Sequence, residues 1–226
     1  EGFNVTIPHK QKIIPYLDEM DASAKRYGAV NTVKVKDRKL IGYNTDGYGF
    51  IKGLEMEGVV LKDQPVLLLG AGGAARMAAY ELLQKGARLT IANRNVQRAQ
   101  ELKEELTQNG NPSEIKVCGL DGIDQGYVCM VNATPVGMFP YEEEVPVSVE
   151  VIKKSNVIYD LIYNPYHTKL LKMAQHHGCK VINGFPMLFY QAVKAQKIWL
   201  GDQKIREEDF QSIYQEIENH LRRGSR

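Results

Sequence analysis

The stretch Pro65-Val-Leu-Leu-Leu-Gly-Ala-Gly-Gly-Ala-Ala-Arg76 decides the fold class. It opens on a short apolar run, which is typical of a buried strand. The glycines and alanines that follow turn the chain directly into a helix, which we expect over 73–85 and ending at Gly86. A buried strand that passes at once into a helix predicts a sheet whose strands are covered by helices.

Strands and helices alternate after this stretch. Further strands are expected at 88–92, 127–132, 156–162 and 180–182, and helices at 167–177 and at 95–108, the latter ending near Gly110. This alternation needs crossover connections, so it predicts a parallel sheet. After residue 186 the strands stop, and amphipathic helices are expected at 187–200 and 206–222.

Shorter elements precede the stretch. A hairpin-like pattern covers 29–43 with Asp37-Arg38-Lys39 as its turn, and a helix is expected from residue 47 to about residue 57. Together the patterns predict an α/β protein with a doubly wound parallel-sheet (Rossmann) domain at 47–183. A second, split α/β domain is expected from 1–46 and the returning helices of 184–226.

The glycine turn has the features of a dinucleotide-binding loop. Gly70 allows a tight turn, and Gly72 lets backbone N–H groups approach a pyrophosphate. Gly73 and Ala74 are small enough for the helix to pack closely with its N-terminus toward the anion, and Ala75 stands where a third glycine is usual. Glycine loops also occur by chance, but the strand before this one and the helix after it favour nucleotide binding.

The end of the second strand indicates which dinucleotide is bound. An NAD enzyme usually has Asp or Glu about 20 residues beyond the first glycine, where it binds the ribose 2′-hydroxyl. This chain has Asn93-Arg94 there, and Arg98 follows one helical turn later. Two guanidinium groups at a helix start can converge on a 2′-phosphate, so NADP is preferred. The alternative is that both arginines are solvated surface charges.

Two segments supply a candidate acid/base pair. Lys10 ends the run Asn4-Val-Thr-Ile-Pro-His-Lys10, and Asp46 lies in Asn44-Thr-Asp-Gly47. Each is weak alone, because Lys10 could be a surface lysine and Asp46 an ordinary helix N-cap. Together they suit redox chemistry at a carbinol, in which a lysine beside a fixed carboxylate takes and returns the hydroxyl proton.

Composition argues against several other classes of protein. The chain has 226 residues, 43% of them hydrophobic and 25% charged, which is ordinary for a globular protein, and no apolar run is long enough for a membrane span. A net charge of +2 without a basic run gives no reason to expect nucleic acid or a membrane as partner. The three cysteines are widely spaced and predict neither disulfides nor a metal site. A cytoplasmic protein with a small-molecule partner is expected.

At these residues the chain resembles the shikimate dehydrogenase family. The shared motifs, in order, are Asn4-Val-Thr-Ile-Pro-His-Lys10, Gly28-Ala-Val-Asn-Thr32, Asn44-Thr-Asp-Gly47, Gly70-Ala-Gly-Gly-Ala-Ala75, Ala92-Asn-Arg94, Val131-Asn-Ala-Thr-Pro-Val-Gly-Met138, Tyr159-Asp-Leu-Ile-Tyr-Asn-Pro165, and Asn183-Gly184 followed by Met187 and Tyr190-Gln-Ala192. Order and spacing both agree over most of the chain, and several motifs are long, so coincidence is remote.

The resemblance implies an oxidoreductase of aromatic amino acid biosynthesis that reversibly reduces 3-dehydroshikimate to shikimate with NADPH. It implies that Lys10 and Asp46 are the catalytic pair. The residues implied to bind substrate are Thr6, Lys10, Asn31, Asp46, Tyr163 and Gln191. Those implied to bind NADP are Gly70, Ala71, Gly72, Gly73, Ala74, Ala75, Asn93, Arg94 and Arg98, with Ala133, Thr134, Leu161, Gly184 and Met187 at its nicotinamide end. For Tyr163 and Gln191 the alternative is ordinary packing.

The chain also departs from the family's pattern. The family's substrate domain begins with a strand-helix-strand unit whose Ser-x-Ser element grips the substrate carboxylate, and no residues here supply it, so this domain is expected to be N-terminally incomplete. Asn95 and Pro186 stand where Thr and Gly are commoner. Two alternatives stay open: a truncated, catalytically silent NADP-binding fragment, and a quinate/shikimate dehydrogenase of broader specificity. A homodimer is left open as well.

Overall fold

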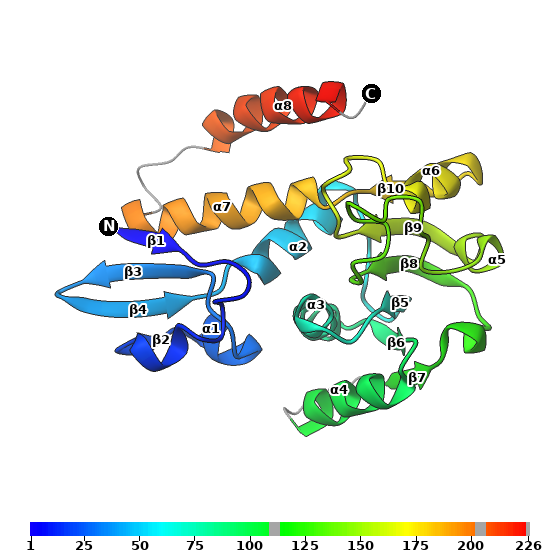
Figure 1. Ribbon diagram of the computed structural model, residues 1–226, viewed down its shortest axis with the longest axis horizontal. Helices are drawn as coiled ribbons and strands as arrows, with labels where there is room; N and C mark the ends of the chain where they lie inside the picture. Colours follow the sequence, from blue (N-terminus) through cyan, green and yellow to red (C-terminus); the bar gives the residue numbers. More distant parts are fainter. Residues whose placement is uncertain (109–113, 202–206, 225–226) are drawn as a thin grey trace. The chain divides into compact units, whose positions relative to one another are not determined.

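The structure, a computed structural model, describes residues 1–108, 114–201 and 207–224 (Figure 1). The chain forms two compact units, of which unit 1 contains Glu1–Lys52 and Pro186–Arg223 and unit 2 is built from Gly53–Phe185. The functional division expected from the sequence, at 1–46, 47–183 and 184–226, stays a prediction, and residues 225–226 of its last segment lie outside the described part.

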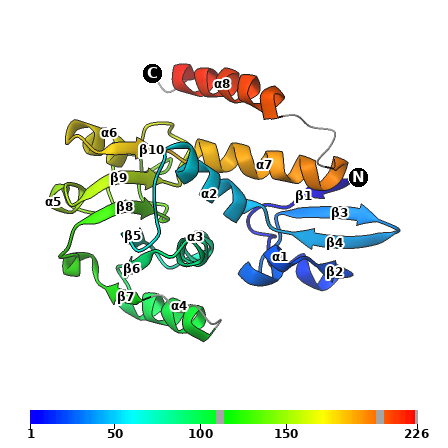
Figure 2. The same cartoon turned by 180° about the vertical axis from the view of Figure 1, so that it is seen from behind.

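Unit 2 is built on a sheet with the strand order β10-β9-β8-β5-β6-β7, in which every neighbouring pair is parallel. α3 and α4 cover one face of this sheet, and α5 and α6 cover the other (Figures 1 and 2). The strand order reverses between β5 and β8, which confirms the doubly wound fold. The elements are β5 (Pro65–Leu69), α3 (Gly73–Gln84), β6 (Arg88–Ala92), α4 (Val96–Gln108), β7 (Ile115–Cys118), a 3-10 turn (Leu120–Gly122), β8 (Tyr127–Asn132), α5 (Val149–Ile152), β9 (Ser155–Asp160), α6 (Lys169–His176) and β10 (Lys180–Ile182).

The central strands of this sheet are buried on both faces, which explains their unbroken apolar runs. Leu67 of β5, Met130 of β8 and Ile158 of β9 are fully buried, and they share one cluster with Leu170 and Leu171 of α6. Burial of each such side chain contributes roughly 1.5–3 kcal/mol to stability. The apolar runs of the sequence therefore coincide with the buried strands of the sheet.

β7 is a strand that the sequence pattern did not predict. It is short and lies at the sheet edge, and its burial alternates from buried Ile115 to exposed Lys116. Such a strand lacks the continuous apolar run of its neighbours. Residues 109–113 precede it, so the helix end expected near Gly110 lies outside the described residues.

Unit 1 contains a sheet with the order β1-β3-β4-β2. Its strands are β1 (Gly2–Asn4), β2 (Glu19–Met20), β3 (Thr32–Lys36) and β4 (Lys39–Tyr43). β3 and β4 form the expected hairpin. Asp37 and Arg38 join them with φ of 51° and 63°, and positive φ at both positions marks a two-residue type I′ turn. Lys39, which we expected in the turn, already belongs to β4.

The helices that accompany this sheet are a 3-10 turn (Ile14–Tyr16), α1 (Ala22–Tyr27), α2 (Asp46–Met56), α7 (Phe185–Leu200) and α8 (Glu207–Gly224). The short α1 was not predicted, but its signals are clear in retrospect. The Asp21 side chain accepts a hydrogen bond from the Ser23 N–H at 2.8 Å, and the helix ends at Gly28 with φ of 60°. Among the described helices, none has the length and apolar character to cross a membrane.

Candidate active site

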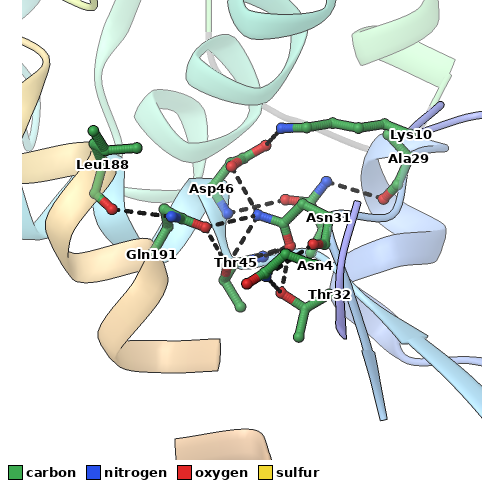
Figure 3. A network of polar contacts seen from close by, with 10 residues as sticks. Asn4, Lys10, Ala29, Asn31, Thr32, Thr45, Asp46, Leu188 and Gln191 are labelled. Atoms are coloured by element: carbon green, nitrogen blue, oxygen red, sulfur yellow. Dashed lines mark hydrogen bonds and ion pairs between the residues drawn. The ribbon is translucent and has the colours of Figure 1, made fainter. Parts of the chain in front are cut away.

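Lys10 and Asp46 form an ion pair within unit 1, with 2.7 Å between Nζ and Oδ2 (Figure 3). Their side chains are 27% and 17% exposed, so both keep access to water. Asp46 is the first residue of α2. Its N–H donates to Asn44 Oδ1 at 3.0 Å, and its carboxylate accepts from Lys10.

Asn31 joins the ion pair to the protein interior. Its side chain is buried, and Nδ2 donates to Asp46 Oδ1 at 2.8 Å. Its Oδ1 accepts hydrogen bonds from the Thr45 N–H and the Thr32 hydroxyl, both at 2.9 Å. Each carboxylate oxygen of Asp46 therefore has its own donor, Oδ1 from Asn31 and Oδ2 from Lys10. Hydrogen bonds to a charged acceptor are the stronger kind, so this arrangement fixes the carboxylate.

Gln191 reaches the same network from α7, as Figure 3 shows. Its Oε1 lies 3.3 Å from both Asn31 Nδ2 and Thr45 Oγ1. Its Nε2 donates to the Leu188 carbonyl at 3.0 Å, which leaves the oxygen end of the amide toward the network. Asn31 and Gln191, two of the residues implied to bind substrate, therefore lie beside the Lys10–Asp46 pair.

Close packing of two helices places Gln191. A Cβ atom on Gly49 of α2 would overlap the Met187 carbonyl oxygen and come within 2.9 Å of the Gln191 nitrogen. Only glycine allows α7 to approach this part of α2 so closely. At its other end α7 is tied to β3, where Trp199 Nε1 donates to the Val33 carbonyl at 2.9 Å.

The two other residues implied to bind substrate belong to different units. Thr6 is exposed in the segment after β1, and its carbonyl accepts a hydrogen bond from the His9 N–H at 2.8 Å. Tyr163 is 48% exposed and belongs to unit 2, in the segment after β9. Among the described residues of unit 1, no hydrogen bond links the Thr6 side chain to Lys10 or Asp46. Their roles stay predictions.

Unit 2 has a cavity of about 670 Å³ at the carboxyl ends of β5, β6 and β8. This is the edge at which doubly wound sheets bind ligands, and the volume lies in the usual range for small-molecule sites. The lining residues that the sequence implied for NADP are Gly70, Ala71, Gly72, Asn93, Arg94, Arg98, Ala133 and Thr134. The sequence did not indicate the apolar wall of Leu120, Val136 and Val145, or the exposed Glu144 beside it.

The glycine turn has the geometry that a phosphate loop needs. Gly70 has φ of 110°, and its N–H donates to the Ala92 carbonyl at 2.9 Å. Gly72 precedes α3, and a Cβ atom there would meet nothing, so the helix N-terminus opens onto free space. Gly73 is exposed and equally open, so it does not serve close helix packing as expected. Ala75, by contrast, is fully buried.

Arg94 and Arg98 line the cavity beside this turn, and both are exposed. The turn between them is tied by Asn93 Nδ2, which donates to the Asn95 carbonyl at 2.8 Å. Asn95 Oδ1 accepts a hydrogen bond from the Arg98 N–H at 3.4 Å, so asparagine takes the place at this helix start that threonine would have. Both guanidinium groups are available to an anion.

The remaining residues implied for the nicotinamide end lie elsewhere in the chain. Leu161 and Gly184 adjoin in unit 2, because a Cβ atom on Gly184 would overlap the Leu161 carbonyl. Met187 belongs to unit 1, in the first turn of α7. Pro186 lies in that same turn, where its missing N–H costs nothing, so it begins the helix without distorting it.

A buried carboxylate supports the Thr134 side of the cavity. Asn132 Oδ1 accepts hydrogen bonds from the Thr134 N–H and hydroxyl, at 3.1 and 2.7 Å. Asn132 Nδ2 donates to Asp160 Oδ1 at 3.0 Å, and Asp160 also accepts from the Ile162 N–H and the Thr168 hydroxyl. Burial raises the pKa of Asp160 to about 6, although these three donors act to lower it.

Comparison with known proteins identifies the family of this chain. The family model of the shikimate dehydrogenase substrate binding domain matches residues 1–33, and that of shikimate / quinate 5-dehydrogenase matches residues 54–125. The shikimate dehydrogenase (NADP(+)) of Methanocaldococcus jannaschii is 48% identical over 204 residues, which are 88% of this chain and 72% of that protein.

Solved structures give the same result. A shikimate dehydrogenase in complex with NADP+ is 46% identical, with a TM-score of 0.81 over 88% of this chain and 71% of that one. The shikimate 5-dehydrogenase of Thermus thermophilus, in complex with NADP(H) and shikimate, is 34% identical, with a TM-score of 0.82 over 98% of this chain and 78% of that one. The chain therefore belongs to the shikimate dehydrogenase family.

Proposed function

We propose that this protein catalyses the reversible NADPH-dependent reduction of 3-dehydroshikimate to shikimate, a step of aromatic amino acid biosynthesis. The observation that carries the proposal is the Lys10–Asp46 ion pair, with 2.7 Å between Nζ and Oδ2. A cation that can give up a proton stands beside a carboxylate whose two oxygens are both held by donors. Proton transfer to a carbonyl oxygen requires such a positioned proton donor.

Proton transfer assigns a distinct role to each partner. NADPH, when bound, supplies the hydride that goes to the carbonyl carbon. As the carbon–oxygen double bond opens, the Lys10 ammonium donates a proton to the oxygen, and in the reverse direction the neutral amine takes that proton back. The Asp46 carboxylate holds Nζ in place. The partial exposure of Lys10 lets water restore its proton after each turnover.

The residues of unit 2 fit NADP. Free space above Gly72 suits a pyrophosphate at the start of α3, and no acidic side chain ends β6 to repel a 2′-phosphate. Arg94 and Arg98 supply forked donors for that phosphate. We assign Ala133, Thr134, Leu161, Gly184 and Met187 to the nicotinamide end, and Thr6, Asn31, Tyr163 and Gln191 to the substrate.

We also place the protein in the cytoplasm, because Cys118, Cys129 and Cys179 are all free thiols, which fits a reducing compartment. A homodimer remains a prediction, and light scattering after gel filtration tests it.

The absorbance of NADPH tests the function directly. The protein is assayed with shikimate and with quinate, each with NADP and with NAD. We expect the highest kcat/KM for shikimate with NADP. A higher value for quinate would favour the enzyme of broader specificity, and NADP binding without turnover in any combination would favour the silent fragment.

A further inference from the structure

The orientation of the Asn31 side-chain amide is set by its neighbours. The Thr45 N–H can only donate, so the Asn31 atom that lies 2.9 Å from it is the oxygen. The nitrogen then faces Asp46 Oδ1 at 2.8 Å, where a carboxylate requires a donor. A reversed amide would place two oxygens against each other at this contact and two donors against each other at Thr45.

The Thr32 hydroxyl favours the same orientation of the Asn31 amide. Thr32 is fully buried at the start of β3, and its Oγ1 accepts a hydrogen bond from Asn4 Nδ2 at 3.2 Å. Its single proton is then directed to Asn31 Oδ1 at 2.9 Å. The direction of donation therefore runs from Asn4 through Thr32 to Asn31, and from Asn31 to Asp46 (Figure 3).

We infer that Thr32 is a positioning residue for the reaction: its hydroxyl holds the Asn31 amide so that Nδ2 fixes Asp46 Oδ1 and leaves Oδ2 to Lys10. This inference rests on the proposed function. The Thr32 hydroxyl acts on the ion pair through Asn31. Its effect should fall on the rate of proton transfer rather than on binding of the cofactor in unit 2.

Thr32→Val tests the inference, because it keeps the shape of the side chain and removes the hydroxyl. We expect kcat to fall about fivefold, which corresponds to about 1 kcal/mol, while KM for NADP stays unchanged. Thr32→Ser keeps the hydroxyl and should restore most of the rate. Thr90→Val, in buried strand β6, is the matched control for the loss of a threonine hydroxyl in a strand, and it should keep the wild-type kcat.

A second readout does not need activity. The side-chain NH2 resonances of Asn31, assigned by their loss in Asn31→Asp, should shift in Thr32→Val and stay in place in Thr32→Ser. Asn4→Asp changes the hydrogen bond that Thr32 accepts from residue 4. Residue 4 is exposed, so this variant can be used if Thr32→Val does not fold. A carboxylate at residue 4 would draw the Thr32 proton away from Asn31, so the same resonances should shift.

The outcomes separate the inference from the function. Wild-type kcat in Thr32→Val, a Thr32→Ser variant as slow as Thr32→Val, or NH2 resonances that do not move would each overturn the role of Thr32. If the wild type itself fails to oxidise shikimate, the proposed function falls, and the NH2 resonances alone decide whether Thr32 orients Asn31.

Discussion

Asp160 should make the folded protein less stable as the pH rises through the weakly acidic range. Its carboxylate is fully buried in unit 2, and burial raises its pKa from an ordinary 3.8 to about 6. A raised pKa means that the folded state holds the proton more tightly than the unfolded state does. The contribution of Asp160 to stability is therefore fully present below pH 3.8, is lost as the pH rises from 3.8 through 6, and stays lost above that range.

The size of the effect follows from the two pKa values. Their difference corresponds to about 3 kcal/mol at 1.36 kcal/mol per unit, and roughly half of it falls between pH 5 and pH 7.5. Asp160→Asn removes the titration and can keep all three hydrogen bonds, because its amide can donate to the Thr168 hydroxyl.

Urea unfolding followed by circular dichroism measures this effect. Relative to the wild type, Asp160→Asn should gain roughly 1.5 kcal/mol when the pH goes from 5 to 7.5. Asp121→Asn, an exposed site of the same unit, is the control and should show no such gain. An equal difference between Asp160→Asn and the wild type at both pH values would refute the reasoning.

The remaining predictions concern the active site. Lys10→Ala should lower kcat at least ~100-fold with NADP affinity nearly unchanged, whereas Lys12→Ala, an exposed lysine of the same segment, should not; equal rates in the two variants would contradict the role of Lys10. Replacing Arg94 and Arg98 with alanine should raise KM for NADP at least ~10-fold and barely change KM for NAD, and a parallel loss for both cofactors would show that they do not read the 2′-phosphate. Gly49→Ala should cost roughly 1–3 kcal/mol in urea unfolding and raise KM for shikimate, because α7 must move; unchanged stability would show that the close approach is absent.

Much of the fold was predictable because the central strands of unit 2 are buried on both faces. Such strands are continuous apolar runs in the sequence. Leu67 and Leu69 of β5 lie in an apolar run, and the run alone predicts their burial, whichever elements cover the strand. The positive φ of Gly70 was likewise readable, since a strand that turns at once into a helix needs such a residue. β7 escaped prediction because an edge strand with an exposed Lys116 carries too little apolar pattern.

The hydrogen-bond network of the site was not predictable in the same way. Lys10 and Asp46 could be paired from the chemistry they suit, but the sequence does not say which groups hold them. Thr45 and Thr32 bind the Asn31 amide only because the turn before α2 comes beside the start of β3. Such contacts depend on tertiary geometry, and no spacing rule along one chain reports them.

The same network limits how a substrate can use Asn31 in the proposed enzyme. Its Nδ2 has two hydrogens, yet three acceptors lie near it: Asp46 Oδ1 at 2.8 Å, Thr45 Oγ1 at 3.0 Å and Gln191 Oε1 at 3.3 Å. A substrate hydroxyl can therefore accept from Asn31 only by replacing one of them. We expect Gln191, which makes the longest of the three contacts, to be the one that is replaced, so that its amide oxygen can accept a hydrogen bond from the same ligand. We therefore expect binding and release of substrate to exchange partners around Asn31 while the Asp46 contact stays intact.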